Sequence, residues 1–176
     1  MTSHKMKKGK GKIPLTRQQG TVDVLKRLDV LNRRERHAVL ATDDRGQPYT
    51  SLVAYALTPD ARGALFATPK KSTKYRNILR NRKVSLMIDT RSNTPRGYLE
   101  ADAVTIIGTA SPLRKGLKRQ HMADLFLKKH PRLRDFVRAD STVLVFVSVN
   151  RVIHAGRFQM VTEWSADAVR KSKKKI

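Results

Sequence analysis

The most informative part of the sequence is Phe66-Ala67-Thr68-Pro69-Lys70-Lys71-Ser72-Thr73-Lys74-Tyr75-Arg76-Asn77. It joins an apolar run to a segment with helical spacing, so we expect a strand to end at Thr68 and a helix to begin near Ser72. The helix start gathers hydroxyl groups, free backbone N–H groups and the ammonium group of Lys74, with Lys70 and Lys71 just before it. Such donors suit a phosphate. A capped surface helix with solvated lysines is the alternative interpretation of the same residues.

Before this stretch, the sequence changes from helical to strand patterning. Apolar residues at helical spacing predict an amphipathic helix from Thr21 to about Arg36. Three short segments rich in aliphatic residues follow, at 37–42, 49–57 and 64–68, and turn sequences separate them. This order predicts three strands joined as a meander.

After this stretch, helical and strand patterns alternate in blocks. Residues 72–81 and 115–130 have helical spacing, whereas 83–89, 103–110 and 142–149, continuing towards Ile153, have strand patterning. About six strands and three helices without a βαβ rhythm predict a β-rich α+β fold. Its sheet should be mainly antiparallel and closed or nearly closed, with the helices flanking it.

The formal net charge of +24 is concentrated at the two ends of the chain. Residues 1–18 carry six Lys or Arg, residues 170–175 carry five, and neither segment contains an acid; the interior holds 27 bases against 14 acids. We therefore expect a disordered basic tail over 1–19, one domain over 20–165 and a second basic tail over 166–176. Such tails are suited to weak contact with polyanions.

Composition also bears on the compartment and the metal chemistry. The chain contains no cysteine, which excludes disulfides, thiolate metal sites and cysteine nucleophiles. Its five histidines show no metal-binding spacing, so no metal site is expected. No apolar run reaches the roughly 18 residues of a membrane span, and the basic N-terminus lacks the apolar core of a signal peptide. We expect a cytoplasmic protein without a membrane span.

The order of these segments resembles the FMN-binding split barrels of the pyridoxamine 5'-phosphate oxidase-like superfamily. The resemblance covers about residues 21–161. Its four blocks are Gly46-Gln47-Pro48-Tyr49-Thr50-Ser51-Leu52-Val53, Gly63-Ala64-Leu65-Phe66-Ala67-Thr68, the segment from Lys74 to Leu86, and Ile107-Gly108-Thr109-Ala110. It implies a split β-barrel that binds FMN at the interface of a homodimer and acts as an oxidoreductase on a small molecule.

The resemblance also implies which residues bind the cofactor. Three groups are involved: Ser51, Leu52 and Val53 beside the flavin; Ala67 and Thr68 along the ring and ribityl chain; and Ser72, Thr73 and Lys74 at the phosphate. From their place in the preceding loop, Lys70 and Lys71 are expected to add positive charge to the phosphate site. A further contact is implied for Arg157, because Arg157-Phe158 is similar to the family's Arg-Phe pair after the last strand. No catalytic side chain is identified.

The chain departs from the oxidases at several positions of the motif. Ser51 and Thr73 stand where those enzymes usually have arginine, and Ile153 and Ala155 stand where they have the substrate-binding arginine and histidine. The resemblance therefore does not extend to the substrate of those oxidases, which is a form of vitamin B6. Two alternatives stay open: a split barrel that uses a deazaflavin or haem, for which His154 is a candidate ligand, and a basic nucleic-acid-binding protein.

Overall fold

The computed structural model describes residues 16–18, 21–91, 94, 101–156 and 160–166. Its helices are α1 (Thr21–Arg34), α2 (Thr73–Arg80), α4 (Leu117–Lys129) and α5 (Arg134–Arg138), with a single 3-10 turn, η1 (Pro131–Leu133), before α5. Its strands are β1 (Thr16–Gln18), β2 (His37–Asp44), β3 (Gln47–Leu57), β4 (Gly63–Pro69), β5 (Lys83–Asp89), β6 (Ala103–Pro112), β7 (Thr142–Gly156) and β8 (Met160–Ser165). The six predicted strands and three predicted helices are all present.

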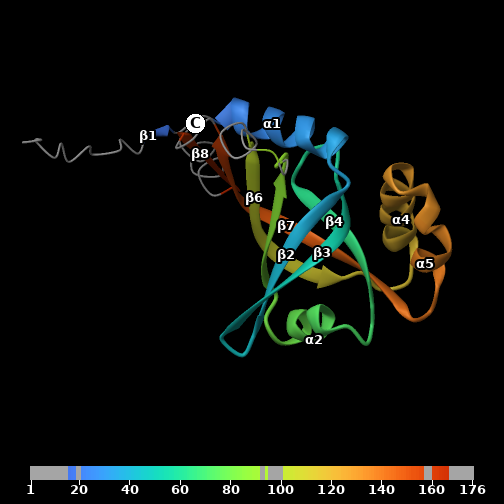
Figure 1. Cartoon of the computed structure of the whole chain (residues 1–176). Helices are drawn as coiled ribbons and strands as arrows, with labels where there is room; N and C mark the ends of the chain where they lie inside the picture. The colour runs from blue at the N-terminus through green and yellow to red at the C-terminus, as the bar shows by residue number, and fades with distance from the viewer. Residues whose placement is uncertain (1–15, 19–20, 92–93, 95–100, 157–159, 167–176) are drawn as a thin grey trace, which may run out of the picture.

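Six of the strands close into a barrel. The hydrogen-bonded order β7-β4-β3-β2-β5-β6 returns to β7 through a β6–β7 pairing, and every pairing in this ring is antiparallel. Helix α1 lies across one end of the barrel and α2 across the other, whereas α4 and α5 pack on its side (Figure 1). The predicted β-rich α+β fold, a mainly antiparallel split barrel with flanking helices, is confirmed.

The long strand β7 belongs to two parts of the sheet. Its first half pairs with β4 and its second half pairs with β8, while β6 runs along its other edge. The β6–β7 register shifts by one residue at Ile107/Gly108, which is a β-bulge and bends the strand. This bend lets one strand close the barrel and also extend beyond it.

Two strands were not expected from the sequence. Strand β8 pairs with β7, and β1 pairs in parallel with β8. The expectation of an unstructured segment over 1–19 is thus wrong for Thr16–Gln18, because β8 offers a free strand edge that the sequence pattern did not reveal. The rest of the two expected tails, namely 1–15, 19 and 167–176, lies outside the described residues.

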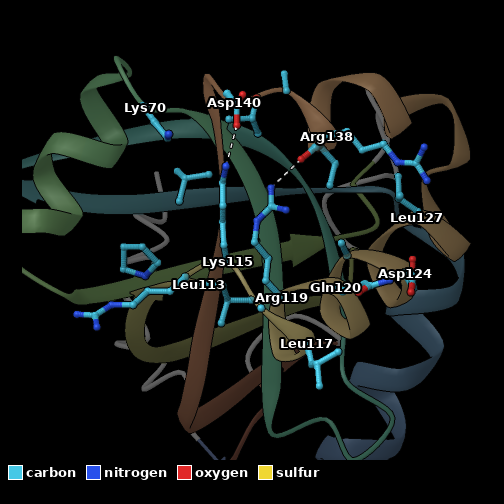
Figure 2. Close-up of a pocket in the computed structure, with 18 of the residues that line it drawn as sticks. Lys70, Leu113, Lys115, Leu117, Arg119, Gln120, Asp124, Leu127, Arg138 and Asp140 are labelled. Atoms are coloured by element: carbon cyan, nitrogen blue, oxygen red, sulfur yellow. Dashed lines mark hydrogen bonds and ion pairs between the residues drawn. The ribbon is translucent and has the colours of Figure 1, made fainter.

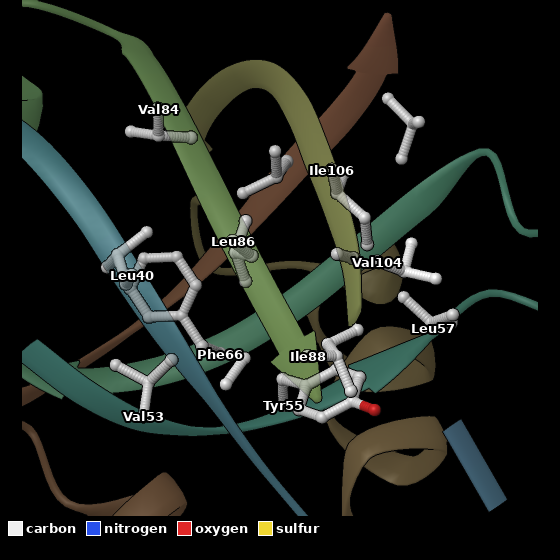
Figure 3. Close-up of a cluster of buried hydrophobic side chains, with 14 of the residues drawn as sticks. Leu40, Val53, Tyr55, Leu57, Phe66, Val84, Leu86, Ile88, Val104 and Ile106 are labelled. Atoms are coloured by element: carbon white, nitrogen blue, oxygen red, sulfur yellow. The ribbon is translucent and has the colours of Figure 1, made fainter. Parts of the chain in front are cut away.

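The barrel interior is filled by alternate residues of its strands. Val84, Leu86 and Ile88 of β5 point inward together with Leu40, Phe66 and Ile106 (Figure 3). A second apolar cluster, around Leu65, Phe126 and Leu144, lies between the barrel wall and α4. β7 is apolar on both faces because it serves both clusters, so packing within one chain accounts for the run 143–147.

Candidate functional site

The N-terminus of α2 follows directly from the end of β4. Ser72 is the N-cap residue, with an extended backbone, and its Oγ accepts a hydrogen bond from the Tyr75 amide at 3.3 Å. The Oγ of Ser72 also lies 2.9 Å from Oγ1 of Thr68, which is buried near the end of β4. The strand therefore holds the cap residue of the helix through a pair of hydroxyl groups.

This helix end is rich in free donors. The Ser72 amide donates to the Pro69 carbonyl, but the amides of Thr73 and Lys74 have no protein acceptor among the described residues. The first turn contains no acidic residue, and Lys70 and Lys71 are exposed in the preceding turn. Unpaired amides, the positive end of the helix dipole and nearby ammonium groups together favour an anion such as phosphate.

The barrel opens between β3 and β4 on the side where β4 ends and α2 begins. These strands pair only at Tyr55↔Phe66, Ala56↔Leu65 and Leu57↔Ala64. β2, in contrast, pairs with β3 along residues 47–54. In the described part of the chain no strand pairs with the other edge of β3 over 47–54, so this edge keeps backbone donors and acceptors for another partner.

The predicted cofactor-binding residues border this opening. Ser51, Leu52 and Val53 lie on the unpaired part of β3, and Ala67 and Thr68 lie on β4 beyond its pairing with β3. The structure thus brings both strand segments to the opening and places Lys70, Lys71, Ser72, Thr73 and Lys74 after β4. Arg157 lies outside the described residues.

The side chains of the predicted cofactor-binding residues differ in exposure and in hydrogen bonding. Leu52 is 66% exposed, whereas Val53 is buried in the barrel core and can offer only its backbone. The Oγ of Ser51 is buried and has no hydrogen-bond partner among the described residues. The Thr73 hydroxyl accepts from the Arg76 guanidinium at 3.2 Å, so it is only partly available. The exposed Leu52 side chain, the free edge of β3 and the donors at the start of α2 are groups of the kinds that an aromatic ring, its polar rim and a phosphate would contact.

A second cluster of polar side chains lies at the far end of β7. Oδ1 of Asp102 is 2.6 Å from Nε2 of His154, and its Oδ2 forms an ion pair with Arg27 of α1. Burial lowers the pKa of His154, and the positive charge of Arg27 lowers it further. The sequence singled out His154 but missed both partners, because the pairing of β6 with β7 brings Asp102 and His154 together.

A large cavity lies beside α4 and shares Lys70 with the predicted phosphate-binding segment. Its volume is about 890 Å³, and it is bounded by the β6–α4 linker, α4, α5, the start of β7 and the β4–α2 turn (Figure 2). Five basic residues line it, namely Lys70, Arg114, Lys115, Arg119 and Arg138. Only Lys70 of this set was singled out from the sequence.

Two further findings concern metals and membranes. Among the described residues, His, Asp and Glu form no group of three or more that could hold a metal ion. None of the described helices is long and apolar enough to cross a membrane.

The family follows from comparison with known proteins. The model of the pyridoxamine 5'-phosphate oxidase family matches residues 26–155, and the chain belongs to that family. The match contains the barrel strands β2 to β7, with α2 and α4. A search of curated protein sequences finds no match for the chain.

Solved structures share the fold at low sequence identity. A haem-binding protein from Mycobacterium smegmatis has a TM-score of 0.72 and 18% identity over 82% of this chain and 59% of its own. Campylobacter jejuni ChuZ has a TM-score of 0.72 and 17% identity over 85% and 62%. A FAD-binding protein from Mesorhizobium loti has a TM-score of 0.60 and 20% identity over 73% and 88%. The chain thus spans about three-fifths of the first two proteins.

Proposed function

We propose that this protein is a flavoprotein that binds FMN and acts as an oxidoreductase on a small molecule. The observation that carries the proposal is the helix start of α2, where the paired hydroxyl groups of Thr68 and Ser72 lie beside two free amides and three lysines. This group of donors stands at the end of the β3–β4 opening. Membership of the pyridoxamine 5'-phosphate oxidase family supports the same ligand class.

Each part of the site has a role in holding the cofactor. The amides of Thr73 and Lys74 and the Ser72 hydroxyl would bind the phosphate, while Lys74 adds a positive charge. The exposed side chain of Leu52 would cover the ring system, and the free edge of β3 would hydrogen-bond its polar rim. Bound flavin supplies hydride and electron transfer, and the protein fixes its orientation and excludes water.

A homodimer is part of the proposal. Leu52 is 66% and Tyr49 is 37% exposed on the part of β3 that borders the opening. Apolar side chains beside a ligand site are what a second copy of the chain would cover, with FMN between the two copies.

A reduced nicotinamide is the proposed electron donor.

Haem is the second candidate ligand, and His154 is the observation that favours it. Its Nε2 is held by Asp102, which fixes the ring and leaves Nδ1 as the possible ligand atom. A carboxylate behind an iron-bound histidine is a recurrent arrangement in metal sites. Haem would not require the phosphate donors at α2, so the two candidates predict different effects of substitutions there.

The proposal is tested by reconstitution of the full chain with FMN, haemin or a deazaflavin in parallel, followed by removal of free ligand and absorbance spectroscopy. We expect flavin bands at about one FMN per chain, reduced in Lys74→Ala and Ser72→Ala. Lys26→Ala is the matched control, because Lys26 is an exposed lysine on α1 at the opposite end of the barrel (Figure 1). A haem spectrum with no retained FMN, or full FMN retention by Lys74→Ala, would contradict it.

A further inference from the structure

We propose that the cavity beside α4 is a second ligand site, which binds a small molecule with a phosphate or carboxylate group on an apolar body. The cavity of about 890 Å³ lies in the size range of small-molecule sites, about 300–1,000 Å³. Its apolar wall includes Leu113, Leu127, Val137 and Val143. The apolar wall suits the body of the ligand. The charged side chains around this wall determine whether the head group of the ligand is positively or negatively charged.

Basic side chains outnumber acidic ones in this cavity. Asp124 and Asp140 are the acids that line it, against five bases. Lys115 pairs with Asp140 at 3.2 Å, and Arg119 donates from Nη2 to the Val137 carbonyl at 2.9 Å, which fixes its guanidinium without neutralising it. Figure 2 shows Lys115 and Arg119 reaching across from the α4 side, with Lys70 on the other side. The remaining charge is positive and favours an anion.

The N-terminus of α4 adds backbone donors to the same wall. Its N-cap residue is Gly116, which has no side chain to cap the helix and a φ of +138°. The Gln120 amide bonds to the Gly116 carbonyl at 3.1 Å, but the amides of residues 117–119 have no protein acceptor among the described residues. The first turn of this 13-residue helix contains no acid. An anion in the cavity would therefore meet free amides as well as the positive end of the helix dipole.

A buried hydroxyl group in the cavity wall provides independent evidence for a ligand. Thr142, at the start of β7, is 5% exposed and lines the cavity. Its Oγ1 is buried and has no hydrogen-bond partner among the residues that the structure describes. A buried hydroxyl left unpaired costs about 1–3 kcal/mol, so such groups usually have a partner. An oxygen atom of a bound anion would accept this hydrogen bond once the side chain turns its hydroxyl group toward the cavity.

The test uses phenyl phosphate and benzoate as separate probes, with benzyl alcohol as the neutral control, and isothermal titration of the full chain. We expect the anions to bind and benzyl alcohol not to bind. Arg119→Gln and Lys115→Gln should each weaken the binding at least fivefold. Lys118→Gln removes the same charge from the same turn of α4, but Lys118 does not line the cavity and this variant should bind normally.

Lys115→Gln guards against a trivial loss of folding. Lys115 and Asp140 are 89% and 88% exposed at their side chains, so loss of this surface ion pair should leave the fold intact. Preference for phenyl phosphate or for benzoate shows which anionic group the site accepts. Equal binding by wild type, Arg119→Gln and Lys115→Gln, or an equal loss in Lys118→Gln, would overturn the proposal.

Saturating FMN separates this site from the proposed flavin site. Lys70 borders both, but the other charged residues of the cavity lie on the β6–α4 linker, on α4, on α5 and in the α5–β7 turn. We expect phenyl phosphate to bind equally well with and without FMN, and Arg119→Gln to retain FMN. Binding of phenyl phosphate by a protein that takes up no FMN would refute the flavoprotein proposal alone. Complete displacement by FMN would refute the second site.

Discussion

The hydroxyl groups of Thr68 and Ser72 lie 2.9 Å apart and connect the end of β4 to the N-cap of α2. Thr68 is buried, so its position is fixed by the barrel wall, and the cap residue is fixed through it. The donors at the start of α2 are therefore placed by the barrel and not by a loop. A rigid set of donors loses little entropy when it binds an anion.

Ser72→Ala should destabilise the protein through loss of the helix cap. The substitution removes the acceptor of the Tyr75 amide and the partner of the Thr68 hydroxyl, and loss of an N-cap costs about 1 kcal/mol. Urea unfolding followed by circular dichroism measures this difference. Ser148→Ala is the control, because Ser148 is exposed on β7. Equal stability of Ser72→Ala and wild type would show that the cap contributes nothing.

Tyr55→Phe should leave the free energy of unfolding unchanged or raise it by about 1 kcal/mol. The Tyr55 hydroxyl is buried and has no hydrogen-bond partner in the described part of the chain, so its removal breaks no hydrogen bond and relieves a desolvation cost. Burial also raises the pKa of Tyr55 above its usual range, and Glu35 adds to this shift. Tyr49→Phe, at an exposed tyrosine, is the control. A loss of more than about 1 kcal/mol in Tyr55→Phe would mean that this hydroxyl has a partner in solution.

The closure of the barrel should tolerate no side chain at Gly108. A Cβ there would collide with the Ser148 carbonyl oxygen on β7 and approach a Val147 methyl group at 2.7 Å. Gly108→Ala should therefore lower the free energy of unfolding by about 1–3 kcal/mol, as overpacking does. Thr105→Ala, at a half-buried position on the same strand, should cost less. A fully stable Gly108→Ala variant would show that β6 and β7 are farther apart than described.

Stability should fall as the pH drops below about 6.5, in part because of His130. Burial lowers the pKa of His130; its bond to the Tyr55 carbonyl opposes this, while Lys129, Arg36 and His37 add to it. At such a pH, His130 binds a proton in the unfolded chain but not in the folded chain, so acid favours unfolding. The slope from His130 is at most about 1.4 kcal/mol per pH unit.

Urea unfolding at pH 7.5 and 5.5 measures this effect. His130→Gln should lose less stability between the two pH values than wild type does. His121→Gln, at an exposed histidine on α4, should behave like wild type. If His130→Gln and wild type lose equal stability, His130 is not the group responsible.

Local patterns predicted most of the barrel. The alternation of Val84, Leu86 and Ile88 with polar residues identified β5 and its inward face correctly. Strand β8 was missed because its apolar residues do not alternate clearly, although Trp164 is buried in the core. Its strand state depends on the second half of β7, which is a tertiary contact.

From the residues alone, without the family resemblance, the site was predictable only where its residues are close in sequence. The segment from Thr68 to Lys74 is continuous, and its donors are brought together by one strand end and one helix start. The pair His154 and Asp102 is separated by 52 residues, and the cavity beside α4 combines five segments. Such arrangements follow from the closure of the barrel, which no local pattern contains.

The most direct test of the phosphate site is a comparison of FMN with riboflavin, which differ only in the phosphate, by titration of flavin fluorescence against the full chain. FMN should bind at least about tenfold more tightly, a difference of about 1.4 kcal/mol, and Lys74→Ala should reduce this preference. Equal affinity for FMN and riboflavin, or no affinity for either, would contradict the placement of a flavin phosphate at Ser72, Thr73 and Lys74.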